Sequence, residues 1–149
     1  MKPYSKSIPV LGLALSTQTP EEGITAEVIV VNSFEELWKS VKNATGKIIV
    51  FNQRFEDPEK AIKYRQLGAI EGAKLGAVAT IVRSYATFSL GTPHTGLMFY
   101  SNNVTHIPAA EISIEDAKLL SRLYKKGTVK LLISAPPPPA IFKLVFRMK

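Results

Sequence analysis

Strand-like apolar runs alternate with helical periods along this chain. Residues 26–31 (AEVIVV) and 47–51 (KIIVF) are rich in β-branched residues, which is typical of buried strands. Between them, Ser33 with Glu36 three positions later forms a capping box, which predicts a helix start. Apolar residues then follow at helical spacing: Phe34, Leu37, Trp38 and Val41. The pattern predicts a strand–helix–strand unit whose helix buries one face.

A second helix is predicted over residues 58–77, because proline suits a first helical turn and a helical period follows it. Residues 78–82 (VATIV) form the next strand and complete a second β-α-β unit. Three glycines, Gly68, Gly72 and Gly76, recur at every fourth position. Because glycine weakens a helix, we expect Gly68 and Gly72 to pack closely against the sheet, whereas Gly76 is explained by the helix end.

The remaining pattern completes a mixed α/β arrangement. Residues 9–15 form a first short strand. Ser113 begins a last helix that Gly127 ends, and residues 128–133 form a last strand. Residues 83–108 have no helical period and are rich in Ser, Thr, Gly, Asn and aromatic residues. A loop of this length in a compact domain is usually functional or mobile.

The length fits a single domain, which we place at residues 1–134. Residues 135–149 form a separate, Pro-rich C-terminal tail. Its run at residues 136–139 is stiff and cannot donate backbone hydrogen bonds.

The net charge of +7 is concentrated in the C-terminal part, since no acidic residue follows Asp116. A basic half can bind nucleic acid, but no aromatic-interleaved RNA motif accompanies it. Solvated lysines, and cations at a helix C-terminus, explain the same charges. We therefore predict no nucleic-acid partner. We also predict no membrane span, because no apolar run approaches the roughly 20 residues that a spanning helix needs.

The residues that could carry catalysis are few. A two-zinc site needs several converging carboxylates and imidazoles. This chain has no cysteine and two histidines, His94 and His106. Its two aspartates, Asp57 and Asp116, lie at predicted helix starts, where they have structural roles. No GxSxG, GxGxxG or P-loop lysine motif is present. The sequence therefore predicts no catalytic residue, no metal ligand and no cofactor in this chain.

Four blocks carry a resemblance to a known family. They are EGITAEVIVVNSFEELWKSVKNATGKIIVF (residues 22–51), KYRQLGAIEGAKLGA (63–77), RSYATFSLGTPHTG (83–96) and IPAAEISIEDAKLLSR (107–122). In this order they resemble the protease-associated (PA) domain of carboxypeptidase Q-like zinc metallopeptidases. The resemblance covers most of the chain but not residues 135–149. It implies a mixed β-sandwich or open barrel with flanking helices.

The resemblance also implies a function. In that family the PA domain is a non-catalytic insert, and the peptidase halves carry the ligands of two zinc ions. This chain is therefore predicted to be inactive alone and to govern substrate access or domain contacts beside the peptidase domain. A stand-alone module that binds a peptide or protein through the loop and a free edge strand is the alternative.

Within the long loop, the resemblance points to four residues. Arg83, Phe88, His94 and Thr95 are expected to face the peptidase cleft or a partner. The other interpretation is a loop packed on its own sheet, with proline and glycine as turn residues.

The resemblance implies a secreted or lysosomal protein. Two sequons, at Asn43 and Asn103, lie next to predicted turns and are candidate N-glycosylation sites. Residues 8–15, behind Lys2 and Lys6, could instead be a short signal peptide, but they lack a clean small-residue cleavage site. Substrate, oligomeric state and completeness of the chain stay open at this point.

Overall fold

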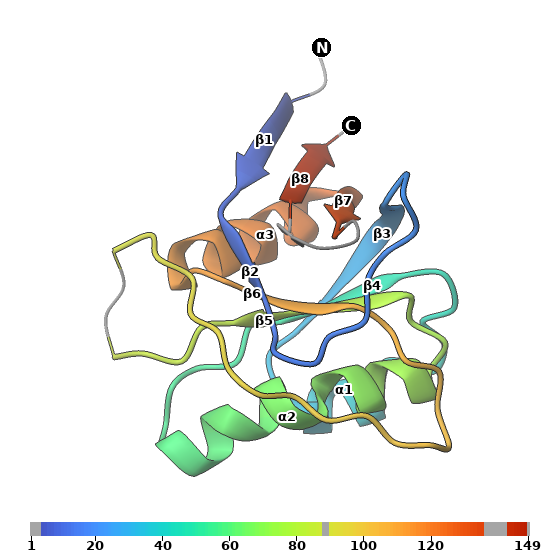
Figure 1. Cartoon of the computed structure of the whole chain (residues 1–149). Helices are drawn as coiled ribbons and strands as arrows, with labels where there is room; N and C mark the ends of the chain where they lie inside the picture. The colour runs from blue at the N-terminus through green and yellow to red at the C-terminus, as the bar shows by residue number, and fades with distance from the viewer. Residues whose placement is uncertain (1–3, 88–89, 136–142, 149) are drawn as a thin grey trace.

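An eight-stranded sheet organises the residues that the computed structural model describes, 4–87, 90–135 and 143–148 (Figure 1). In chain order the strands are β1 (Tyr4–Ile8), β2 (Val10–Gly12), β3 (Ile24–Val31), β4 (Ile48–Phe51), β5 (Ala79–Arg83), β6 (Ala109–Ile112), β7 (Val129–Ser134) and β8 (Lys143–Met148). Across the sheet they lie in the order β1-β8-β7-β3-β4-β5-β6-β2. The predicted mixed α/β class is confirmed.

The two outer strands, β1 and β2, are consecutive in the chain and are separated by Pro9 alone. β1 pairs antiparallel with β8, and β2 pairs antiparallel with β6. Residues 4–12 therefore supply both outer strands of the sheet, which brings its two edges close together. The sheet is a nearly closed barrel, as the resemblance implies. The prediction of a single first strand at residues 9–15 is wrong. Pairing begins at Tyr4, Pro9 interrupts it because it has no N–H to donate, and Leu15 already has a left-handed φ of 73°.

Three helices cover the sheet: α1 (Phe34–Ser40), α2 (Pro58–Lys74) and α3 (Ile114–Lys126). In Figure 1, α1 and α2 lie on one face of the central strands, and α3 lies on the other. The predicted helix starts are confirmed. The Ser33 Oγ accepts from the N–H of Glu36 at 3.0 Å, and the Ser113 Oγ accepts from the N–H of Asp116 at 3.1 Å.

Strand β4 is buried on both faces, which divides the core into two layers. Ile48 and Val50 belong to the layer under α3, which includes Leu120. Ile49 and Phe51 belong to the layer under α1 and α2, which includes Leu37. Successive side chains of a strand point to opposite faces. A strand that is covered on both faces therefore needs an apolar residue at every position, as β4 has.

Trp38 departs from the predicted buried face of α1. Its exposed fraction is 58%, whereas Leu37 is fully buried. The helix is only seven residues long, so its apolar face is narrow. Trp38 stacks on Phe34 at 5.8 Å between ring centroids, and its Nε1 donates to the Glu71 carboxylate at 2.9 Å. It therefore links α1 to α2 from outside the core.

Residues 143–148 form part of the sheet, although the sequence sets residues 135–149 apart as a tail. β8 pairs antiparallel with both β7 and β1, and its side chains Leu144 and Phe146 are buried. The predicted polyproline run at residues 136–139 lies outside the described residues.

The glycines of α2 allow close approach to the sheet, as predicted. A Cβ on Gly68 would lie 3.0 Å from the Phe51 ring, and a Cβ on Gly72 would lie 2.7 Å from the Thr80 Cγ2. Gly76 has a φ of +84° just beyond the helix, which confirms its role at the helix end.

We expect Gly72→Ala to lower the free energy of unfolding by about 1–3 kcal/mol, because the added methyl group forces α2 or β5 to shift. Urea denaturation followed by circular dichroism measures the change. Gly127→Ala is the matched control, since a Cβ there meets no atom within 4 Å. Equal stability of the two variants would show that α2 has room to move away from the sheet.

Candidate functional site

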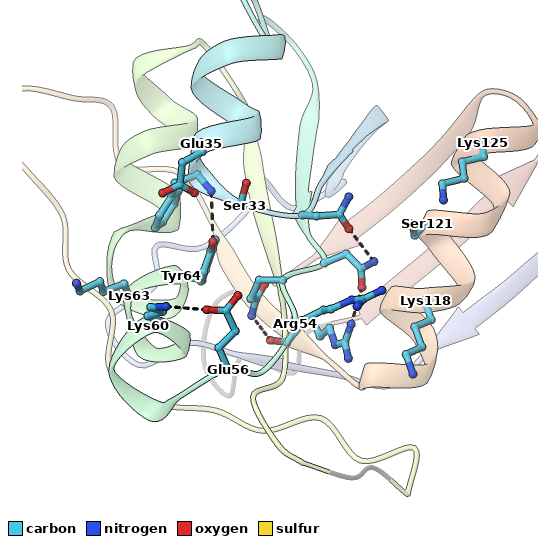
Figure 2. Close-up of a pocket in the computed structure, with 15 residues that line it drawn as sticks. Ser33, Glu35, Arg54, Glu56, Lys60, Lys63, Tyr64, Lys118, Ser121 and Lys125 are labelled. Atoms are coloured by element: carbon cyan, nitrogen blue, oxygen red, sulfur yellow. Dashed lines mark hydrogen bonds and ion pairs between the residues drawn. The ribbon is translucent and has the colours of Figure 1, made fainter.

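A hollow of about 830 Å³ lies at the carboxyl ends of β3, β4 and β5 (Figure 2). These three strands are parallel, so Val31, Phe51 and Arg83 end at one edge of the sheet. The residues after the strands form the floor, α1 and α2 form one wall, and α3 forms the other. The central strands are parallel, and ligands commonly bind outside the carboxyl ends of parallel strands, so this is the candidate functional site.

A chain of side-chain hydrogen bonds crosses the floor from strand to strand. The Asn52 Nδ2 donates to the Asn32 Oδ1 at 3.3 Å, and the Arg83 Nη1 donates to the Asn52 Oδ1 at 3.2 Å. The Gln53 Nε2 donates to the Arg83 backbone carbonyl at 2.7 Å. Asn52, Gln53 and Arg83 are all less than a tenth exposed. The ends of β4 and β5 are therefore tied together by buried polar groups, and the exposed Asn32 extends this chain of hydrogen bonds to the end of β3.

Positive charge gathers at one side of this floor. Arg54, Arg83 and Lys118 line the hollow, and the same three residues line a neighbouring hollow of about 630 Å³. None of the three makes an ion pair with any residue that the structure describes. Burial lowers the pKa of the Arg83 guanidinium, and the nearby charge of Arg54 lowers it further, while Glu115 opposes both effects.

The opposite wall carries a more balanced charge. The Glu56 carboxylate accepts from the Lys60 Nζ at 2.7 Å, and Glu35 and Lys63 also lie along this wall (Figure 2). The hollow is therefore polarised, with unpaired cations at the floor and α3, and a mixture of acids and lysines at α1 and α2.

The structure places the predicted loop residues differently from one another. Arg83 lines both hollows. The backbone N–H of His94 donates to the Ser84 Oγ at 2.8 Å, and the Thr95 Oγ1 donates to the Gly12 carbonyl at 2.7 Å. The residues His94 and Thr95 are exposed and line neither hollow. Phe88 lies outside the described residues. The loop thus packs its backbone on its own sheet and leaves two of the predicted side chains exposed.

The sequence analysis missed Asn52, Gln53, Arg54 and Lys118. The first three follow directly after the buried run at residues 47–51, so their place at a strand end was visible in the sequence. Lys118 was classed with the solvated basic residues, and its proximity to Arg83 depends on the packing of α3 across the sheet.

A buried ion pair joins α2 to β6, and its arginine also contacts the long loop. The Arg65 Nε donates to the Glu111 Oε2 at 3.0 Å, and the Arg65 Nη2 donates to the Glu111 Oε1 at 3.1 Å. The exposed fractions of the two side chains are 8% and 1%. The same guanidinium lies 4.7 Å from the centroid of the Tyr85 ring, and it fills the space beside Gly96 that a Cβ would need. One side chain on α2 therefore joins β6 to two points of the loop.

Both predicted glycosylation sites lie in exposed turns. The Asn43 Oδ1 accepts from the N–H of Thr45 at 2.8 Å, and the N–H of Asn103 donates to the Ser101 Oγ at 3.3 Å. Both asparagines are exposed. Their glycosylation stays a prediction.

No group of three potential metal ligands from His, Asp or Glu is found within residues 4–87, 90–135 and 143–148. His106 stacks on Tyr100 at 4.2 Å between ring centroids. Over the same described ranges, no helix has the length and apolar character needed to cross a membrane.

No family model matches the chain. It is 48% identical over 133 residues to carboxypeptidase Q of Xenopus laevis and 46% identical over 133 residues to that of Homo sapiens, and each match covers 89% of the chain. The chain is a homologue of one segment of carboxypeptidase Q. The resemblance carried by the four sequence blocks is confirmed. The chain spans about 28% of the length of these relatives.

Solved structures show the same fold. A peptidase M28 precursor from Shewanella amazonensis has a TM-score of 0.73 at 24% identity, covering 98% of this chain and 37% of that one. An aminopeptidase from an Aneurinibacillus strain has a TM-score of 0.55 at 15% identity, covering 98% and 36%. A zinc aminopeptidase from Bacillus subtilis has a TM-score of 0.54 at 20% identity, covering 92% and 35%. Each of these peptidases therefore contains this fold within a longer chain.

Burial raises the pKa of the Glu111 carboxyl to about 7, against the opposing effect of the Arg65 guanidinium. The pKa in the folded state is thus above the ordinary value of 4.5, so the folded state binds the proton more tightly than the unfolded state. The stabilisation from this protonation is complete below pH 4.5 and is lost as the pH rises through 7.

We therefore expect the stability of the wild type, measured relative to Glu111→Gln, to fall by about 3 kcal/mol between pH 4.5 and 7. The glutamine cannot titrate, so the difference isolates this carboxyl. Urea denaturation at several pH values measures it, with Glu22→Gln as the control for an exposed carboxylate. A rise over the same pH range would mean that Arg65 outweighs burial.

Proposed function

We propose that this chain is the non-catalytic PA part of a zinc-dependent carboxypeptidase or dipeptidase of the carboxypeptidase Q type. The observation that carries the proposal is close identity over a small share of each relative. The chain matches carboxypeptidase Q at 46–50% identity over at least 84% of its own length, but over no more than 28% of theirs. Such a match is expected of one module of a larger enzyme.

An apolar surface supports a contact between this module and the peptidase part. Four large side chains are exposed by 39–70%: Leu15, Leu67, Leu97 and Phe99. They lie near one another, because Ala14 and Leu97 form a parallel bridge and the N–H of Phe99 donates to the Gln66 carbonyl at 3.1 Å. Exposed apolar patches of this kind mark interfaces. In this proposal, the part of carboxypeptidase Q outside the matched segment covers the patch.

In this proposal, the exposed residues His94 and Thr95 of the loop face the substrate cleft of the peptidase part. Arg83 contributes from the strand end beneath the loop. In the intact enzyme two zinc ions would polarise the peptide carbonyl and activate a water. This chain supplies the cover of the cleft, and the Arg65 side chain contacts the loop at Tyr85 and Gly96. The same enzyme family supports the prediction of a secreted or lysosomal protein.

The alternative, a stand-alone module that adds a peptide strand to its edge, has less support. The two outer strands of the sheet are short: β2 has three residues and β1, which directly precedes it in the chain, has five. Such short edges offer few backbone groups to an added strand.

The proposal is tested in a chimera in which this chain replaces the matching segment of Xenopus laevis carboxypeptidase Q. We expect the chimera to hydrolyse dipeptides with zinc, and the chain alone to hydrolyse none. His94→Ala with Thr95→Ala should raise KM about 5-fold, or about 1 kcal/mol, with kcat little changed, because the pair contacts bound substrate.

The matched control is His106→Ala. This histidine belongs to the same loop but lies near the amino ends of the parallel strands, whereas the candidate site lies at their carboxyl ends. It comes two residues before Pro108, whose carbonyl accepts from the N–H of Thr80 at the start of β5. Unchanged kinetics in the double variant would eliminate the cleft-facing role. A folded chimera without dipeptidase activity would contradict the proposed function itself.

A further inference from the structure

Arg83 is a buried cation without a carboxylate partner among the described residues. Its exposed fraction is 9%, and among the described residues its side chain makes one hydrogen bond, to the neutral Asn52 amide. A buried charge is costly unless it is paired or well hydrogen-bonded. The other buried arginine, Arg65, shows the usual solution, a bidentate pair with Glu111. Arg83 has no such pair within residues 4–87, 90–135 and 143–148.

Two more cations converge on the same place. Arg54 follows the end of β4, and Lys118 comes from α3 (Figure 2). Each of the two lines both hollows together with Arg83. Both residues are exposed, and neither side chain makes an ion pair with a described residue. Like charges repel, so three cations gathered from three elements favour the binding of an anion between them.

The acidic groups nearby do not neutralise these cations. Glu56 is paired with Lys60 on the α2 wall, and Glu35 lies on the α1 wall. Glu115 lines the second hollow together with the three cations. Its charge raises the pKa of Arg83, but burial and Arg54 outweigh it, and its carboxylate accepts from the N–H of Gly91 at 3.2 Å.

We propose that Arg54, Arg83 and Lys118 form a binding site for an oxyanion, the carboxylate or phosphate group of a small organic anion. The planar guanidinium groups suit the bidentate geometry of both oxyanions, and the ammonium group adds a further charge. The Arg83 side chain is held by Asn52, and the Arg83 backbone is held by Gln53, so the site is preorganised.

The hollow also accommodates the remainder of such a ligand. Its volume of about 830 Å³ is within the usual range for small-molecule pockets, and the rings of Phe34 and Tyr64 form part of the wall opposite the cations. A ligand with its anionic end at Arg83 and an apolar body against these rings matches both walls. The site does not depend on the proposed peptidase partner.

The test is titration of the full chain with inorganic phosphate and, separately, with glutarate, followed by isothermal calorimetry and by amide chemical shifts. We expect saturable binding of at least one anion that weakens with salt. Arg83→Gln should weaken binding about tenfold and Lys118→Ala severalfold, since both remove charge at the site. Whichever probe binds more tightly identifies the oxyanion as phosphate or carboxylate.

The matched control is Lys126→Ala, which removes an equally exposed lysine of α3 that lines neither hollow. Its affinity should equal that of the wild type. Circular dichroism verifies that Arg83→Gln is folded, and Lys118→Ala tests the site at an exposed position where folding is not at risk. Absence of saturable binding by both anions, or an equal loss in Lys126→Ala, would overturn the proposal. The dipeptidase assay of the chimera is a separate result, so the two proposals can fail independently.

Discussion

The burial of β4 on both faces is the constraint on which the rest of this structure depends. A strand with Ile48 and Val50 on one side and Ile49 and Phe51 on the other needs a helical layer against each face. The chain meets this need with α1 and α2 below and α3 above. These layers diverge beyond the carboxyl end of β4, and the candidate site occupies the space between them. The same apolar run thus defines both the core and the position of the hollow.

Close approach of α2 to the sheet adds a second condition. Gly68 and Gly72 allow the helix to lie against Phe51 and Thr80. At this short distance Arg65 reaches across to Glu111 on β6, which would otherwise be a buried carboxylate without a partner. The Arg65 side chain also lies against Gly96 and Tyr85, so one residue of α2 contacts both β6 and the long loop. Burial raises the pKa of its partner Glu111 to about 7, so the charge state of the pair depends on pH.

The two buried arginines differ in what they imply. Arg65 is satisfied within the domain, and its role is structural. Among the described residues, Arg83 has one hydrogen bond, to a neutral amide, and two cations line the same hollow. Leu15 and Leu97 form a second feature, because they are large apolar side chains exposed to solvent. The two features lie in different places, and each is the basis of a separate proposal: a small anion at Arg83 and a protein surface at the exposed apolar residues.

The sequence by itself determined the local elements, because capping, periodicity and strand composition act over a few residues. The helix starts are capped by Ser33 and Ser113, and the end of α2 has the positive φ of Gly76, as the sequence predicts. The spacing of the α2 glycines likewise predicts close packing against the sheet. Only the tertiary structure decided which distant groups meet. The pairing of β8 with β1, the pairing of Arg65 with Glu111, and the meeting of Lys118 with Arg83 each join residues more than 30 positions apart. No local pattern encodes such contacts, because they depend on strand order and on the distance between layers.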